Sequence, residues 1–200
     1  MDGNQGALPW TAPVSFEKES YKMKLPKQVA DQIEANQSEM LETLRTLIAF
    51  PSIATAEPED GYPFGKPCAD ALRFMLQKAE QMGFSAQNFD DYIGSVDWMP
   101  EAQQQPELGI LCHLDVVPVL AENWSSDPFV MEERDGCLFG RGCIDDKGPA
   151  VAVLYAMKAI RDAGIPLQKN VRFIMGCNEE NGSSDLEYYQ AHAAMPPHVF

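Results

Sequence analysis

The chain has 200 residues, of which 45% are hydrophobic and 22% are charged, and its formal net charge at pH 7 is −15. Such a composition is typical of a soluble globular chain that buries one good core or a large part of a bigger one. The acidity argues against nucleic acid and anionic membranes as partners, because both attract clustered Lys and Arg. No run reaches the roughly 20 apolar residues of a membrane span, and residues 1–23 lack the pattern of a secretory signal.

The first half of the chain predicts a surface arm, two helices and a hairpin. Helices are predicted where apolar residues recur with a helical period, and strands where short apolar or alternating runs flank turn residues. The expected elements are an arm over residues 1–25, a helix from Pro26 to a stop at Pro51, a helix over 72–82 ended by Gly83, and strands over 84–89 and 92–98 around Asp90 and Asp91.

The second half alternates strands with helices. The expected elements are a buried strand over 108–112, a hairpin of 129–134 with 137–139, a helix from Lys147 to Gly164 with Pro149 in its first turn, a strand over 171–177, and a helix capped by Ser184 that runs through Tyr189. This alternation predicts an α/β fold, a three-layer sandwich with a mainly parallel central sheet.

Three runs of metal-ligand residues follow the apolar strands. They occupy residues 113–115, 142–148 and 178–182. In an open sheet, ligands collect where the strands end and side chains converge. One imidazole and several carboxylates at neighbouring strand ends therefore predict a site for one or two divalent metals.

His113 and Asp115 form the first of these runs. If the strand persists, residues two apart leave the same face, so Asp115 can accept a hydrogen bond from the imidazole and fix its tautomer for metal binding. A purely structural His–Asp pair would have the same spacing, and that alternative stays open.

The other two runs are pairs of acids. Asp145 could bridge two cations, whereas Asp146 suits the N-terminal cap of the following helix. Glu179 and Glu180 would point opposite ways in extended chain, so that one binds metal while the other takes a proton from a metal-held water. A solvated acidic turn is the alternative for this pair.

The five cysteines are an odd number without C-x-x-C spacing: Cys68, Cys112, Cys137, Cys143 and Cys177. This pattern favours small buried side chains in a reducing, cytoplasmic compartment. The alternative is that Cys112 or Cys143, each within two residues of a candidate ligand, contacts the metal.

Four runs in order resemble the dinuclear zinc metallopeptidase superfamily, which includes aminoacylase, glutamate carboxypeptidase and succinyl-diaminopimelate desuccinylase. They are GILCHLDVVP (109–118), WSSDPF (124–129), GRGCIDDKGP (140–149) and NEENGS (178–183). Together with DLEYY (185–189), they look closest to the peptidase V, or Xaa-His dipeptidase, branch. The resemblance extends from about Val29 to the end of the chain.

The resemblance implies a zinc-exopeptidase-like catalytic domain with two divalent metals, Zn²⁺ or alternatively Mn²⁺ or Co²⁺. His113 and Glu180 would bind different metals, Asp145 would bridge them, Asp115 would orient His113, and Glu179 would be the general base that deprotonates the attacking water. At position 178 this chain has Asn where many relatives have Asp or Thr.

The resemblance also implies that residues 26–200 are a truncated, N-terminal part of the catalytic domain. Relatives carry a further Asp ligand soon after the position of Phe200, a final His ligand and a lid domain. His192 and His198 are poor candidates to replace them. We expect a dipeptidase acting on dipeptides or short peptides, with an N-acyl amino acid deacylase as the alternative.

A rival of another class is a non-catalytic remnant or association module that buries an incomplete sheet against a partner. Such a chain would expose apolar surface and self-associate. In either case we expect the 200-residue chain alone to bind metal weakly and to hydrolyse nothing.

Overall fold

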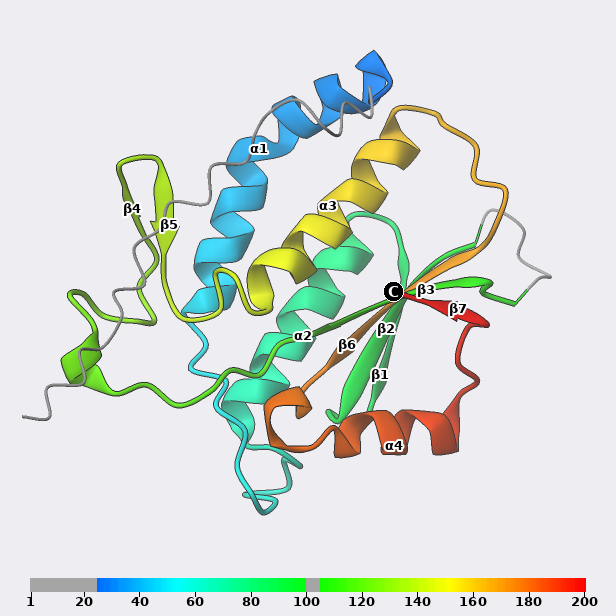
Figure 1. Cartoon of the computed structure of the whole chain (residues 1–200). Helices are drawn as coiled ribbons and strands as arrows, with labels where there is room; N and C mark the ends of the chain where they lie inside the picture. The colour runs from blue at the N-terminus through cyan, green and yellow to red at the C-terminus, as the bar shows by residue number, and fades with distance from the viewer. Residues whose placement is uncertain (1–24, 100–104) are drawn as a thin grey trace, which may run out of the picture.

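The computed structural model describes residues 25–99 and 105–200 (Figure 1). The arm predicted over residues 1–25 lies outside these residues except for Leu25, whose side chain is exposed. In the described part, no helix combines the length and apolar character that crossing a bilayer would require.

Helices and strands alternate as the sequence predicts. The elements are α1 (Lys27–Ile48), α2 (Lys66–Gln81), β1 (Ser85–Phe89), β2 (Ile93–Trp98), β3 (Leu108–His113), the 3₁₀ turn η1 (Ala121–Asn123), β4 (Glu132–Arg134), β5 (Cys137–Phe139), α3 (Lys147–Asp162), β6 (Val171–Gly176), the 3₁₀ turn η2 (Glu179–Asn181), α4 (Ser184–His192) and β7 (His198–Val199). Helix α2 begins at Lys66, earlier than predicted, and Pro67 lies in its first turn, where proline is tolerated.

The main sheet has the strand order β1-β2-β6-β3-β7. Strands β6, β3 and β7 run parallel to one another, β2 is antiparallel to both β1 and β6, and so four of the five strands point the same way. The α/β fold with a mainly parallel sheet is confirmed, and β2 makes that sheet mixed. Strands β4 and β5 form a separate hairpin, as predicted.

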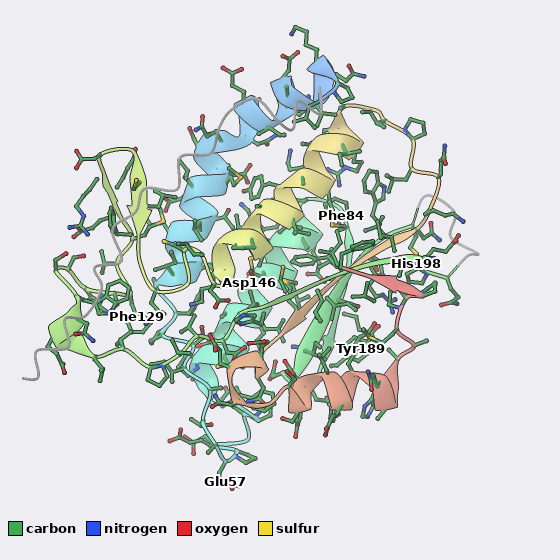
Figure 2. All side chains as sticks on the ribbon, in the orientation of Figure 1. Glu57, Phe84, Phe129, Asp146, Tyr189 and His198 are labelled. Carbon is green, nitrogen blue, oxygen red and sulfur yellow. The ribbon has the colours of Figure 1, made fainter. Side chains whose placement is uncertain are left out.

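Helices cover both faces of the sheet, which gives three layers. On one face α2 contacts β1 and β2, α3 contacts β3 and β6, and α1 packs on α3; α4 contacts β2 from the other face. Side chains of a strand alternate between faces, so Phe173 joins the large core while Ile174 packs with Tyr189 of α4. Figure 2 labels Phe84 and Tyr189 on opposite sides of the sheet.

The pairing of β3 with β6 positions the polar loops. His113, the last residue of β3, lies opposite Gly176, the last residue of β6. The amide of Leu114 extends this pairing by donating to the carbonyl of Gly176 at 2.9 Å. The segments that follow β3 and β6 therefore leave the sheet side by side, as expected at the carboxyl end of parallel strands.

The start of α4 differs from the prediction. Ser184 is the first residue of the helix, and its amide and its hydroxyl both donate to Oδ1 of Asn178, at 3.3 and 2.8 Å. The preceding Ser183 makes no side-chain cap. The prediction that Ser184 caps α4 is wrong because Asn178, six residues earlier, supplies the acceptor.

Candidate metal centre

His113 provides the one imidazole of the site. It is only 8% exposed, and its Nδ1 lies 3.0 Å from the backbone carbonyl oxygen of Asp115. When Nδ1 donates to that carbonyl, the lone pair of neutral imidazole is on Nε2. Nε2 lies 3.0 Å from Oδ1 of Asp145, so the ligand-competent nitrogen faces a carboxylate.

In the metal-free protein the pKa of His113 is raised to about 9. Burial alone would lower it, but the hydrogen bonds and negative charge of Asp115, together with Asp145, outweigh burial. These groups stabilise positive charge at the imidazole, and a metal cation at Nε2 would experience the same carboxylates.

Asp115 is 0% exposed and holds the loop that follows β6. Its Oδ1 accepts from the amide of Glu179 and its Oδ2 from the amide of Glu180, each at 3.1 Å. Its carboxylate is 3.4 Å from Nδ1 of His113, whereas its own carbonyl is closer. The backbone carbonyl of Asp115, and not its carboxylate as predicted, is thus the nearer partner of His113, and the orienting role of the carboxylate stays a prediction. The carboxylate also anchors the Glu pair, a role that the sequence pattern did not indicate.

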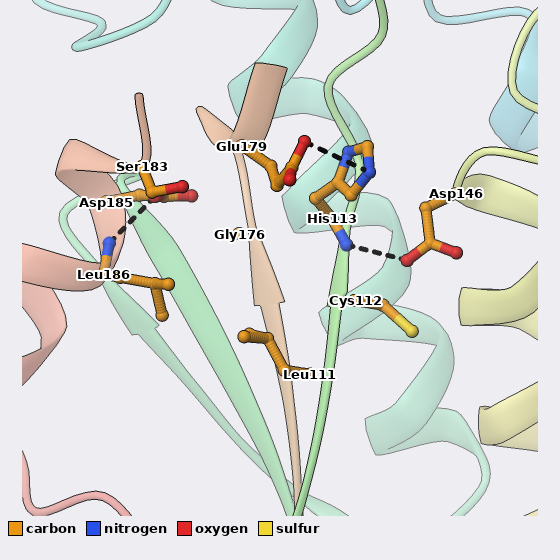
Figure 3. Close-up of a pocket in the computed structure, with 9 residues that line it drawn as sticks. All are labelled: Leu111, Cys112, His113, Asp146, Gly176, Glu179, Ser183, Asp185 and Leu186. Carbon is orange, nitrogen blue, oxygen red and sulfur yellow. Dashed lines mark hydrogen bonds and ion pairs between the residues drawn. The ribbon is translucent and has the colours of Figure 1, made fainter. Parts of the chain in front are cut away.

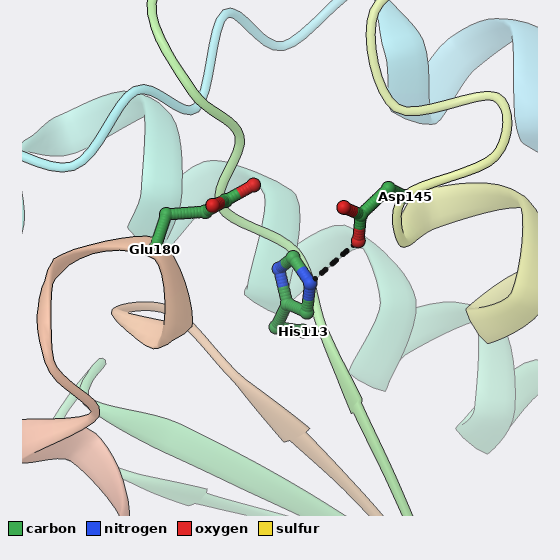
Figure 4. A group of neighbouring side chains, drawn as sticks. All are labelled: His113, Asp145 and Glu180. Carbon is green, nitrogen blue, oxygen red and sulfur yellow. Dashed lines mark hydrogen bonds and ion pairs between the residues drawn. The ribbon is translucent and has the colours of Figure 1, made fainter.

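His113, Asp145 and Glu180 come together in the structure (Figure 4). One potential ligand atom from each lies within 4.8 Å of the others. Burial, followed by the charge of Asp145, raises the pKa of Glu180, as crowding of carboxylates without a cation does. Imidazole nitrogen and carboxylate oxygens are ligands that zinc and related divalent metals accept, so the donor set fits such an ion.

Glu179 lies beside this group but is exposed. Its Oε2 is 3.8 Å from Nε2 of His113, and it lines a cavity of about 200 Å³ (Figure 3). Glu179 and Glu180 belong to η2 and not to extended chain, because β6 ends at Gly176 and Gly182 closes the turn at φ 100°. The extended geometry predicted for the pair is therefore wrong, although only Glu180 joins the ligand group.

Asp146 occupies the N-terminal cap position of α3, but its side chain makes no cap hydrogen bond. Its Oδ2 instead accepts from the amide of His113 at 3.2 Å. The carboxylate thereby ties the loop before α3 to the end of β3. The peptide bond between Asp145 and Asp146 is cis.

Lys147 is a fully buried charged residue whose role no sequence pattern indicates. Its Nζ donates to the carbonyls of Leu47 and Phe50 at 3.1 and 2.7 Å, which joins the end of α1 to the start of α3. Burial lowers the pKa of Lys147 to about 8. The sequence around Lys147 gives no signal for this contact, because its acceptors lie about a hundred residues away.

The cysteines and the later histidines do not join the ligand group. All five cysteines are free; Cys137 is exposed and Cys143 half-buried, so the expectation of buried thiols holds for the other three. Burial raises the pKa of Cys112 to about 12, which disfavours the thiolate that a metal would bind. Among the described residues, the group of possible ligands includes neither His192 nor His198.

The sequence of this region matches a known family model. Residues 109–197 match the model described as peptidase family M20/M25/M40. These residues belong to that family. The match contains all five predicted site residues, and it confirms the resemblance to metallopeptidases.

Two curated relatives carry dipeptidase names. The chain is 42% identical over 142 residues to the putative dipeptidase YtjP of Bacillus subtilis, which covers 71% of this chain and 29% of that protein. It is 38% identical over 169 residues to the Beta-Ala-Xaa dipeptidase of Lactobacillus delbrueckii subsp. lactis. This alignment covers 84% of this chain and 35% of that protein. The chain thus spans about a third of the length of these relatives.

Solved structures of this family have the same fold. Human carnosine dipeptidase 1 matches with a TM-score of 0.70 and 25% identity, over 83% of this chain and 39% of that one. An M20 family metallo-carboxypeptidase from Sulfolobus solfataricus matches with a TM-score of 0.63 and 26% identity, over 76% of this chain and 33% of that one. The three-layer arrangement is therefore that of an M20 peptidase catalytic domain.

Proposed function

We propose that residues 26–200 form the N-terminal part of the catalytic domain of a metal-dependent, cytoplasmic dipeptidase. The observation that carries this proposal is the meeting of His113, Asp145 and Glu180 at the strand ends. The dipeptidase names of the relatives support the substrate class. Because the chain spans about a third of these relatives, the activity is proposed for a complete protein of their length.

Four of the described side chains are assigned to holding the metal ions or to supporting the residues that hold them. His113 and Glu180 would each hold one of two divalent ions, with zinc first among the candidates, and Asp145 would lie between them. Such ions, when bound, supply Lewis acidity toward a peptide carbonyl and lower the pKa of water. Asp115 keeps His113 and the Glu pair in register through the contacts at 3.0 and 3.1 Å.

Glu179 is the proposed general base. It is exposed on the cavity beside His113, and among the Glu pair it is the member outside the ligand group. A carboxylate so placed can accept a proton from the attacking water and return it to the leaving amine. Its backbone is fixed by Asp115 while its side chain is exposed to solvent.

The proposal predicts that Glu179→Ala abolishes dipeptide hydrolysis in a complete protein of the relatives' length. We expect kcat to fall at least ~10²–10⁴-fold, the contribution of a general acid–base group, with metal content unchanged. Glu187→Ala is the matched control, because Glu187 is an exposed glutamate of α4. Activity that survives Glu179→Ala would contradict the proposed role.

A parallel assay compares substrate classes and chain lengths. Dipeptides with a free N-terminus and N-acyl amino acids are offered with Zn²⁺ or Mn²⁺, and faster hydrolysis of the N-acyl amino acids would favour the deacylase. For the 200-residue chain alone we expect weak metal binding and no turnover. Glu179-dependent activity of that chain would contradict this expectation.

A further inference from the structure

Asp185 is a buried carboxylate for which the proposed reaction has no use. It lies in the first turn of α4, is 1% exposed, and lines the cavity beside His113 (Figure 3). Among the ion pairs of residues 25–99 and 105–200, none includes Asp185. Burial accordingly raises its pKa. An ionised carboxylate in this position costs stability unless its hydrogen bonds compensate for burial.

The two oxygens of Asp185 serve different elements. Oδ1 accepts from the amide of Leu186 at 2.8 Å, an ordinary contact for an acid in the first turn of a helix. Oδ2 is directed at the end of β6 and accepts from the amides of Cys177 and Asn178, at 2.6 and 2.9 Å. A helix-capping role accounts for the first oxygen only.

Asp115 continues the row of contacts that Asp185 begins. It accepts from the amides of Glu179 and Glu180, the next two residues of the chain. Four consecutive backbone amides, residues 177–180, are thus held by two buried carboxylates. Successive amides that converge on negative charge form an anion-binding concavity, and here the anions are side chains of the protein itself.

Gly176 makes the close approach of Asp185 feasible. A Cβ atom at this position would lie 2.3 Å from Oδ2 of Asp185, a distance that real Cβ atoms essentially never have. Any side chain at the last residue of β6 would therefore displace the carboxylate from the amides of Cys177 and Asn178. The contacts of Asp185 with these two amides therefore require glycine at position 176.

We propose that Asp185 is a positioning residue for Glu179 and Glu180. By fixing the peptide groups at 177 and 178, it determines where the chain enters η2 and hence where the two glutamates present their carboxylates to His113 and Asp145. The purpose of this positioning rests on the proposed function. The positioning itself is a property of the metal-free chain and can be tested there.

The test is hydrogen exchange of individual amides in the metal-free 200-residue chain, measured by NMR. In Asp185→Asn and in Gly176→Ala, we expect exchange at Glu179 and Glu180 to accelerate at least tenfold. These two amides bond to Asp115, which neither variant alters, so they report on positioning and not on the lost contact. Amides in the middle of α3 should keep their wild-type rates.

Asp97→Asn is the matched control. Asp97 accepts two hydrogen bonds of 2.7 Å from Arg172 at the opposite end of β6, so its replacement weakens two carboxylate hydrogen bonds far from η2. We expect its exchange at Glu179 and Glu180 to stay within twofold of wild type. The Gly176→Ala variant retains every charge and separates displacement of Asp185 from removal of its charge.

Two results would overturn the proposal. Exchange at Glu179 and Glu180 could stay within twofold of the wild-type rates while only Cys177 and Asn178 exchange faster. Asp185 would then affect only the two amides that it contacts. Alternatively, amides of α3 could accelerate as much as those of η2, or the variants could fail to fold, which would make Asp185 a general stability residue.

Metal affinity then separates this inference from the proposed function. We expect Mn²⁺ binding to weaken at least tenfold in Asp185→Asn and to change less than twofold in Asp97→Asn, as measured by calorimetry. If a wild-type protein of the relatives' length binds no metal, the proposed metal centre fails, while the exchange rates of the 200-residue chain still decide the role of Asp185. If wild type and all variants bind metal equally well, Asp185 does not affect the position of the ligands. In that case the inference fails and the proposed metal centre stands.

Discussion

At the residue scale, His113 links metal binding to pH. Its pKa of about 9 in the metal-free protein means that a metal must displace a proton at neutral pH. We therefore expect Mn²⁺ affinity to rise with pH, by up to ~10-fold per unit, and to level off near pH 9. Calorimetry in two buffers of different ionisation enthalpy should detect about one proton released at pH 7.

The stability of the metal-free protein should have the opposite trend. A histidine whose folded pKa lies above the unfolded value of about 6.5 contributes stability that is fully present below pH 6.5 and is lost as pH rises through about 9. Replacement of His113 by Gln should remove both trends, whereas His192→Gln should retain them. Metal affinity that does not change between pH 6 and 9 would contradict the protonated state of His113.

Two of the predicted ligands were accessible from sequence because they lie where strands of the main sheet end. His113 ends β3, and Glu180 comes soon after β6 ends. Asp145 does not lie at such an end, because β5, the strand before it, ends at Phe139 and belongs to the separate β4–β5 hairpin.

The supporting contacts were not accessible. Asp115 reaches Glu179 and Glu180 across more than sixty positions, and Lys147 reaches Leu47 across a hundred. No local period or spacing carries information about a partner so far along the chain.

At the element scale, Gly148 determines how α3 starts. A Cβ atom there would lie 2.0 Å from the carbonyl oxygen of Cys143, so the loop that carries Asp145 must move in Gly148→Ala. We expect a loss of about 1–3 kcal/mol in the free energy of unfolding, as for overpacking elsewhere, and at least tenfold weaker Mn²⁺ binding. Urea unfolding and calorimetry measure the two effects.

Gly136→Ala serves as the control for this change. Gly136 lies in the β4–β5 turn at φ 75°, and a Cβ atom there meets nothing within 4 Å, so the substitution costs backbone strain alone. Its metal affinity should equal that of wild type. If Gly148→Ala also bound metal as wild type does, the start of α3 would not control the position of Asp145.

The observed helices and strands agree with the predicted ones where the sequence has a clear apolar pattern. The apolar repeat of α1 and the short apolar run of β3 predicted both elements. The start of α2 was missed because its first turn is polar or small and gives no periodic signal. The 3₁₀ geometry at Glu179 was missed because a turn of three residues depends on Gly182 and on the carboxylates beneath it.

At the scale of the whole molecule, β7 is an edge of the sheet. Phe200, directly after it, is 81% exposed, and Val199 is also exposed. Exposed edge strands with apolar side chains pair with other chains. We therefore expect the 200-residue chain to self-associate as its concentration rises, with light scattering after size exclusion as the measurement.

Replacement of both Val199 and Phe200 by Lys should return the chain to the monomer mass. Leu120→Lys is the control, because Leu120 is an exposed apolar side chain of the segment that follows β3, away from this edge. Equal association of the two variants would place the contact elsewhere on the surface. A monomer at all concentrations would count against the association-module alternative.

The parallel pairing of β3 with β6 also bears on the order of events as the protein folds. His113 and Gly176 become neighbours only when a crossover of some sixty residues has closed, and such long-range closure is slow. The three side chains of the metal group consequently exist as a group only in the nearly complete fold. A divalent ion would then act late, by mass action on a finished framework, and would not serve as a nucleus around which the polypeptide collapses.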